Sequence, residues 1–179
     1  MMKSYLKAAA FAVATLVASS SANAHGPTPQ KVDMTVTLPA PPEKVWDAIK
    51  DFGNIASWHS GVAKSVGTGS NATGATRILT LKSGGDIDES LDEFDDKGMS
   101  YSYRSGKENV EVFPLSSYSA TLKVKAKDGG SEVEWRSRLY RADTTNEPPE
   151  DRNDAAAVKA MSDFVAAGFE GLKAKFPQK

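Results

Sequence analysis

The strongest constraint on the fold is a long alternation of apolar and polar residues around a double glycine, in YSATLKVKAKDGGSEVEWRSRLY (118–140). A two-residue period is typical of strands that bury one face, and Gly129-Gly130 suits a two-residue turn between antiparallel strands. The inward pairs that this turn predicts are Val124 with Trp135, Leu122 with Ser137, and Ala120 with Leu139. The outward pairs are Lys127 with Glu132 and Lys125 with Glu134, which favours a cross-strand charge ladder over a docking patch.

Three other stretches show the same strand period. KVDMTVTL (31–38) alternates along its whole length, and KGMSYSYRS (97–105) places Met99, Tyr101 and Tyr103 on one face. A further hairpin is predicted in 74–94, turning at Ser83-Gly84-Gly85, and its pairs are Leu81 with Ile87, Leu79 with Glu89, and Arg77 with Leu91. Phe94 breaks the alternation, which indicates a bulge near it.

Other segments change to the helical spacing of three and four residues. PAPPEKVWDAIKDF (39–52) opens with prolines, which suit the first turn of a helix, and Gly53 is expected to end it. NIASWHSG (54–61) is interpreted as a second short turn or helix. From Asp151 to Lys175 the spacing predicts a long helix, with Asn153 or Asp151 as its N-cap. The order of these elements predicts an α+β fold in one domain.

The first 24 residues have the features of a secretory signal peptide. Lys3 and Lys7 precede a short apolar run, and Ala22-Asn23-Ala24 fits a cleavage site, so the mature chain and its single domain are expected to span 25–179. The chain has no cysteine for a lipid anchor or a disulfide. We therefore predict a periplasmic protein of a Gram-negative bacterium that has no membrane association after cleavage.

The charge and the motifs exclude several classes of function. Cleavage removes two lysines and no acidic residue from 22 basic and 23 acidic residues, leaving a formal net charge of -3. A nucleic-acid partner is not expected, because it normally requires a concentrated basic surface. The sequence also lacks a glycine-rich phosphate-binding motif.

Two strings connect this element order to a known family. APPEKVWDAIKDFGNIASWHSGV (40–62) and EVEWRSRLY (132–140) resemble the START-like, polyketide-cyclase (SRPBCC) superfamily. The resemblance covers essentially the whole mature chain and implies the helix-grip fold. In that fold, a curved antiparallel sheet of about seven strands wraps a long C-terminal helix, with two short helices after the first strand and a cavity between sheet and helix. Ser60 stands where the family commonly has a proline, which favours a looser turn.

Four more strings, in separate parts of the chain, give a narrower resemblance. They are HGPTPQKV (25–32), GMSYSYR (98–104), SSYSATLKVK (116–125) and NEPPEDRNDAAAVKAM (146–161). Together they resemble the MxaD family, the periplasmic accessory proteins of bacterial methanol oxidation. The resemblance implies a role in assisting quinoprotein methanol dehydrogenase, or its electron transfer to a c-type cytochrome.

Arg77 and Glu89 are the sharpest candidates for a ligand site. The alternation of the predicted hairpin places both side chains on its inner face as diagonal neighbours. They could form a buried pair there, because an unpaired charge in the interior would be costly. Glu89 could act as a general base or anchor, with Arg77 holding an oxyanion or carboxylate. A structural ion pair at the rim of the sheet is the favoured alternative.

Further candidates for a cavity lining carry aromatic rings or small polar groups. They are Tyr101, Tyr103, Tyr118, Trp135 and Ser137. Aromatic side chains with polar tips suit a cavity that holds a partly apolar small molecule, and they suit packing against a helix equally well.

Trp58 and His59 are expected at the cavity rim, Trp58 as a packing anchor. His59 lacks the cysteine, or the serine and acid at recognisable spacing, that nucleophilic catalysis needs. Copper chelation by His25 at the mature N-terminus would need more ligands than His59 can add. We therefore assign no catalytic residue, no metal site and no cofactor.

The acidic run DIDESLDEFDD (86–96) lacks the ligand spacing of an EF-hand. It is interpreted as a solvated strand at the edge of the sheet, with docking to a basic partner as the alternative.

Three functions remain open. The first is a non-enzymatic accessory protein of methanol oxidation, whose partners would be methanol dehydrogenase or its c-type cytochrome. The second is a cavity enzyme of the polyketide cyclase/dehydrase type that uses Glu89 and Arg77. The third is a carrier of a small hydrophobic ligand.

Overall fold

The computed structural model describes residues 26–178. The predicted signal peptide, its cleavage site and His25 lie outside the described residues. Within 26–178, no helix combines the length and the apolar character that crossing a bilayer requires.

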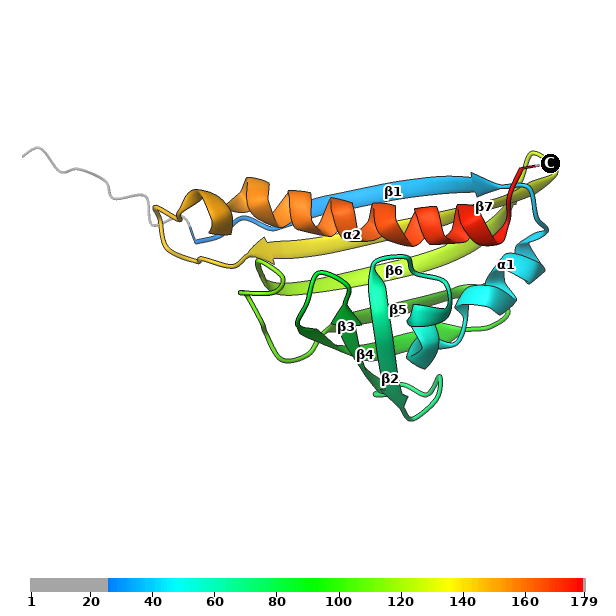
Figure 1. Cartoon of the computed structure of the whole chain (residues 1–179), viewed down its shortest axis with the longest axis horizontal. Coiled ribbons are helices and arrows are strands. Elements are labelled where there is room, and N and C mark those ends of the chain that lie inside the picture. Colours follow the sequence, from blue (N-terminus) through cyan, green and yellow to red (C-terminus); the bar gives the residue numbers. More distant parts are fainter. Residues whose placement is uncertain (1–25, 179) are drawn as a thin grey trace, which may run out of the picture.

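One antiparallel sheet organises the described residues (Figure 1). Its strands, in sequence order, are β1 (Gln30–Leu38), β2 (Val62–Thr68), β3 (Thr76–Leu81), β4 (Asp86–Asp95), β5 (Ser100–Ser105), β6 (Leu115–Lys127) and β7 (Gly130–Arg141). Their spatial order is β1-β7-β6-β5-β4-β3-β2, so the first strand pairs with the last. The two edges of the sheet are therefore β1 and β2.

Two helical segments lie between β1 and β2, and two more follow β7. Two short ones, α1 (Pro42–Ile49) and the 3-10 segment η1 (Phe52–Ser57), connect β1 to β2. Another 3-10 turn, η2 (Glu150–Arg152), leads into the long helix α2 (Asp154–Lys175). The prediction of two short helices after the first strand is confirmed, but Gly53 lies inside η1 instead of ending the first helix.

Helix α2 begins and packs as its sequence dictates. The Asn153 side chain accepts a hydrogen bond from the backbone N–H of Ala156 at 3.0 Å, which caps the helix. Its buried face, which includes Met161, Val165 and Leu172, lies along β1 and β7 (Figure 1). The predicted α+β helix-grip architecture, a sheet gripping one long C-terminal helix, is confirmed.

The β3–β4 hairpin has a different register from the predicted one. Its turn residues are Lys82 to Gly84, one position earlier than expected, because the N–H of Leu81 donates to the carbonyl of Gly85 at 2.9 Å. The strand pairs shift by two residues, and Arg77 lies directly opposite Glu89. A two-residue shift preserves the side-chain parity, so the predicted inward face is unchanged.

The β6–β7 hairpin shows the same kind of correction. Its turn is Asp128-Gly129, and both residues have positive φ (49° and 78°), as a type I′ turn requires. The observed inward pairs are Val124 with Val133, Leu122 with Trp135, and Ala120 with Ser137. On the outer face, Glu132 accepts hydrogen bonds from both Lys125 and Lys127, so a charge ladder forms with a shifted set of partners.

The acidic run is not at an edge of the sheet. It forms β4, which lies between β3 and β5. The β4–β5 pairing has a bulge between Leu91 and Glu93, and its register differs on the two sides of this bulge. The broken alternation at Phe94 predicted a bulge near that residue, and the observed one lies within three residues of it. The sequence could not place the run at the edge or the interior, because strand order follows from pairings between distant segments.

Candidate functional site

Arg77 and Glu89 form an ion pair that is sealed inside the sheet's inner face. Arg77 Nε donates to Glu89 Oε2 at 2.5 Å, and neither side chain has any solvent exposure. The other carboxylate oxygen accepts a hydrogen bond from the Tyr118 hydroxyl at 2.7 Å. Both oxygens of Glu89 are therefore committed to internal partners.

The guanidinium of Arg77 is held by more than Glu89. Nη1 donates to the carbonyl of Phe52 at 2.8 Å, and the group lies 4.1 Å from the ring centroid of Phe52 and 4.8 Å from that of Tyr103. Burial by itself would lower the pKa of Arg77, but the charge of Glu89 outweighs it, so the pKa lies above its ordinary value. Arg77 consequently stays charged.

Burial also shifts the pKa of the tyrosine hydroxyls near Arg77. It raises the pKa of Tyr103 and Tyr118 well above the ordinary value, and the negative charge of Glu89 adds to the effect. The pKa of Tyr101 is raised for the same first reason, although Arg77 opposes the shift. All three hydroxyls remain protonated at neutral pH, so none is a base.

The remaining interior candidates pack into the same aromatic core. Tyr101, Trp135 and Ser137 are buried, and Tyr101 contacts Phe52 edge to face at a centroid distance of 6.0 Å. Three of their polar atoms lack a hydrogen-bond partner among residues 26–178, namely the Tyr101 hydroxyl, Trp135 Nε1 and Ser137 Oγ. The structure thus brings together the seven residues proposed as a ligand lining, but as a packed interior.

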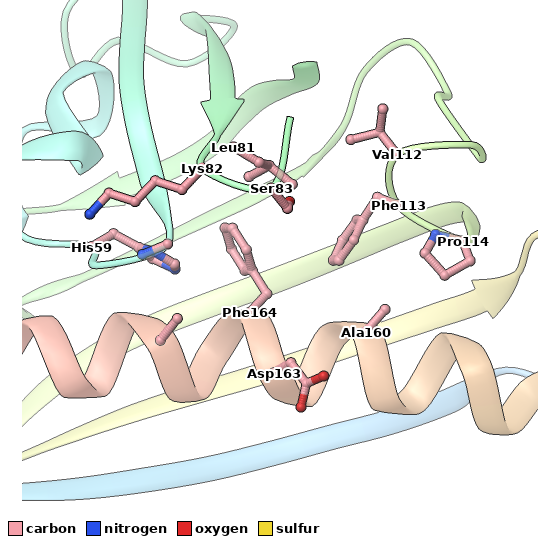
Figure 2. A pocket seen from close by; sticks show the side chains of 12 residues that line it. His59, Leu81, Lys82, Ser83, Val112, Phe113, Pro114, Ala160, Asp163 and Phe164 are labelled. Atoms are coloured by element: carbon pink, nitrogen blue, oxygen red, sulfur yellow. The ribbon is translucent and has the colours of Figure 1, made fainter. Parts of the chain in front are cut away.

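An open cleft lies elsewhere, between helix α2 and two loops (Figure 2). It has a volume of about 270 Å³. One wall is the β3–β4 turn (Leu81 to Ser83), a second is the end of the β5–β6 loop (Val112 to Pro114), and the third is α2 through Ala160, Asp163, Phe164 and Ala167. His59 and Gly61 also line it. None of the seven interior residues lines it.

Gly85 allows the two loop walls to meet. Its φ of 83° is in the region that favours glycine, and a Cβ at this position would lie 2.1 Å from Val112 Cγ2. A side chain here would push the β5–β6 loop away from the β3–β4 turn. Gly85 therefore shapes the cleft as well as the hairpin.

His59 is a neutral, buried wall of the cleft. Its Nδ1 accepts a hydrogen bond from the N–H of Gly61 at 3.1 Å, which assigns the ring proton to Nε2, the nitrogen facing Gly168 of α2. Burial first, and the positive charge of Arg77 second, lower the pKa of His59 to about 4. The imidazole packs 4.3 Å from the ring centroid of Phe164.

Trp58 and His59 were both predicted at the rim, and the structure places them differently. Each side chain is buried, but only His59 lines the cleft. Trp58 packs against Trp135 at a centroid distance of 6.0 Å. Ser60, expected to loosen this turn, donates a hydrogen bond from its hydroxyl to the carbonyl of Ala167 at 2.6 Å and so fastens the link to α2.

The sequence reasoning missed Phe113, Phe164 and Lys82. Ala160, Phe164 and Ala167 recur at four and three residues, a second stripe beside the one that packs on the sheet. That stripe was a usable signal for a second contact surface on α2. For Phe113 and Lys82, nothing in the local pattern separates them from ordinary loop residues.

The geometry can now be compared with known proteins. A family model described as polyketide cyclase / dehydrase and lipid transport matches residues 29–177. The chain belongs to this family. No curated protein matches the chain.

Solved structures share the family's helix-grip fold. A putative uncharacterized protein from Bacillus thuringiensis has a TM-score of 0.68 at 23% identity, covering 83% of this chain and 100% of its own. XoxI from Bacillus cereus has a TM-score of 0.67 at 26% identity, with 82% and 94% covered. Ginseng major latex-like protein 151 from Panax ginseng has a TM-score of 0.63 at only 10% identity, with 84% and 99% covered. At such identities, the similarity establishes the architecture and leaves the ligand open.

Proposed function

We propose that the protein is a non-enzymatic periplasmic binding protein that serves bacterial methanol oxidation as an accessory factor. The observation that carries the binding role is the cleft, whose walls include the apolar side chains Leu81, Phe113 and Phe164. A concave, mostly apolar site with few polar groups is the usual form of a small-molecule site. Its volume of about 270 Å³ suits a small ligand.

The proposed setting rests on the four strings that resemble the MxaD family, together with the signal-peptide pattern at the N-terminus. In this setting, the protein assists methanol dehydrogenase or its electron transfer to a c-type cytochrome. The net charge of -3 expected after cleavage is compatible with a basic partner, because complementary charge mainly steers association.

Deletion of the gene tests the accessory role directly. Methanol-dependent oxygen uptake is expected to fall, and purified methanol dehydrogenase with its cytochrome is expected to recover electron transfer when the mature protein is added. The purified protein alone is expected to turn over no methanol. Unchanged electron transfer in the deletion strain would remove the methanol role from the proposal.

Two variants of α2 connect that role to the cleft. Ala160→Phe fills the cleft, whereas Ala155→Phe places the same ring on an exposed position of the same helix. We expect complementation by Ala155→Phe and a loss of complementation by Ala160→Phe. If the two variants complement the deletion equally well, the accessory role does not depend on a ligand in the cleft.

A cavity enzyme using Glu89 and Arg77 is the second candidate. A cluster of groups with strongly shifted pKa values, here Arg77, Tyr103 and Tyr118, is typical of functional sites and favours this alternative. Against it, the ion pair has no solvent exposure, and each oxygen of Glu89 already accepts a hydrogen bond from an internal donor. A turnover that Glu89→Gln abolishes in a folded protein would reinstate the enzyme.

A further inference from the structure

Of the two charged residues that line the cleft, one has an ion-pair partner among the described residues and the other has none there. Lys82 and Asp163 are its charged lining residues at neutral pH, since His59 has a pKa of about 4. The carboxylate of Asp163 lies 2.6 Å from the ammonium of Lys159, an ion pair within α2. Lys82 forms no ion pair within residues 26–178, so it is the one uncompensated charge on the cleft wall.

The position of Lys82 suits a ligand head group. Its exposed side chain passes above His59, and Phe164 and Phe113 follow one another along the cleft (Figure 2). All three rings are buried, so the charge of Lys82 lies on the solvent side of them. The imidazole, Phe164 and Phe113 form a continuous row, with centroid distances of 4.3 Å and 5.7 Å. A molecule in the cleft would therefore meet aromatic faces and edges along its body and a single positive charge near the opening.

The volume limits the size of that molecule. At about 270 Å³, the cleft lies just below the range of about 300–1,000 Å³ that is usual for small-molecule pockets, so it suits a ligand of one ring. A planar ring matches the aromatic row, because offset and edge-to-face contacts add to the gain from burial. One anionic group is enough to complement Lys82, and the carboxylate of Asp163 in the lining disfavours further negative charge.

We propose that the cleft binds a small aromatic monocarboxylate, with its ring against the row formed by Phe113, Phe164 and His59 and its carboxylate at Lys82. This inference rests on the proposed binding function and specifies the ligand class. The ring enters a largely preformed apolar site, and the carboxylate stays at the mouth, where it remains partly hydrated. Lys82 thus selects the charge of the ligand, and the aromatic row selects its shape.

Benzoate, benzamide and cyclohexanecarboxylate separate these two contributions. Titration at pH 7, followed by amide chemical shifts in two-dimensional NMR, is expected to move Gly61, Ser83 and Ala167 saturably. We expect benzoate to bind about five-fold more tightly than uncharged benzamide, the upper range for a partly exposed charge pair. Cyclohexanecarboxylate, which keeps the charge and loses the aromatic ring, is expected to bind two- to ten-fold more weakly than benzoate.

Lys82→Met tests the head-group contact. Its side chain is exposed, so the variant is expected to fold normally, to lose about five-fold in benzoate affinity, and to bind benzamide within two-fold of the original protein. Lys175→Met, a like change at the far end of α2, is the control and is expected to alter neither affinity. Lys159→Met exposes the charge of Asp163 and should weaken benzoate selectively.

Three outcomes decide the inference. Loss of the preference for benzoate over benzamide in Lys82→Met supports it. Equal binding of the two ligands by the original protein, or an unchanged preference in Lys82→Met, overturns the carboxylate assignment and leaves a neutral ligand for the proposed function. If neither ligand moves the cleft amides, the binding role of the cleft fails together with this inference, while the deletion phenotype still tests the methanol role.

Discussion

Arg77 in the sheet and His59 beside the cleft are both buried basic side chains, but their surroundings favour opposite charge states. Arg77 has an anionic partner at 2.5 Å, a carbonyl and two aromatic faces, and it stays charged. His59 has only a backbone N–H on Nδ1 and apolar or aromatic neighbours, and it stays neutral. The difference shows that the partner, more than the depth of burial, decides whether this interior holds a charge.

The same contrast separates the two regions in function. In the sheet, Arg77 and Tyr118 each donate to one oxygen of Glu89 and neither Arg77 nor Glu89 is exposed, which is the arrangement of a structural ion pair. At the cleft, the lining is apolar and the charge sits at the mouth, which is the arrangement of a binding site. Of these two regions, only the cleft is open to a ligand.

The largest expected effect comes from breaking the Arg77–Glu89 pair. Arg77→Met leaves the Glu89 carboxylate buried without its cation, and we expect a loss of about 3–5 kcal/mol in the free energy of unfolding, measured by urea denaturation. The matched control is Arg138→Met, which breaks the exposed pair with Asp33 and should lose no more than about 1 kcal/mol.

Replacing both partners tests whether the loss comes from the unpaired charge. In Arg77→Met/Glu89→Leu no charge remains in the interior, so a large part of the lost stability is expected to return. A loss below about 1 kcal/mol in the single variant would mean that water reaches Glu89, and the contrast between a sealed interior and an open cleft would then be wrong.

The next effect depends on pH and comes from His59. The histidine pKa is 6.5 in the unfolded reference and about 4 in the folded protein. As the pH falls from 6.5 to 4, the unfolded chain takes up a proton that the folded protein does not, so stability is lost across that window. The shift corresponds to about 3 kcal/mol.

His59→Gln isolates this contribution, because the carboxylates that titrate in the same range are common to both proteins. The stability difference between the original protein and His59→Gln, from urea denaturation at pH 7 and pH 4, is expected to change by about 3 kcal/mol in favour of the variant at low pH. Parallel pH profiles for the two proteins would show that folded His59 takes up its proton over the same pH range as the unfolded chain, so that burial does not lower its pKa.

The inner faces of the strands could be predicted from sequence, whereas their exact pairings could not. Side-chain alternation alone places Arg77, Glu89, Tyr101 and Trp135 on the inner face. The pairing also depends on where each turn begins, and a turn that begins one residue earlier moves every partner by two positions. Glycine pairs mark a turn without saying which of their neighbours belongs to it, so both hairpins were displaced by the same amount.

The cleft was even less accessible to sequence reasoning. Its walls come from the segments 81–83, 112–114 and 160–167, which only the folded sheet and helix bring together. The interior network has a local signature, charged residues at strand positions that alternation points inward. An open cleft has none, because it is defined by space that side chains leave unfilled.

A smaller effect is expected at the contact between α2 and the link that carries His59. A Cβ at Gly171 would lie 1.9 Å from the carbonyl oxygen of Trp58, a backbone atom that cannot turn aside. We expect Gly171→Ala to lose about 1–3 kcal/mol despite the better helix propensity of alanine. Glu170→Ala, at the exposed neighbouring position, should change thermal stability by less than about 0.5 kcal/mol. If Gly171→Ala gains stability instead, the segment that carries Trp58 and His59 must be able to move away from α2.

The smallest effect should come from filling the cleft itself. Two alanines of α2, one in the core and one in the cleft, allow the two regions to be compared on one helix. Ala157 is fully buried, so Ala157→Leu overpacks the core and is expected to lose about 1–3 kcal/mol. Ala160, one turn further, lines the cleft, and Ala160→Leu should change the free energy of unfolding by no more than about 0.5 kcal/mol because its side chain enters unfilled space. The same variant should abolish the benzoate-induced shifts at Gly61 and Ala167. A large destabilisation by Ala160→Leu would show that the cleft is packed in solution, and the distinction between interior and binding site would then have to be abandoned.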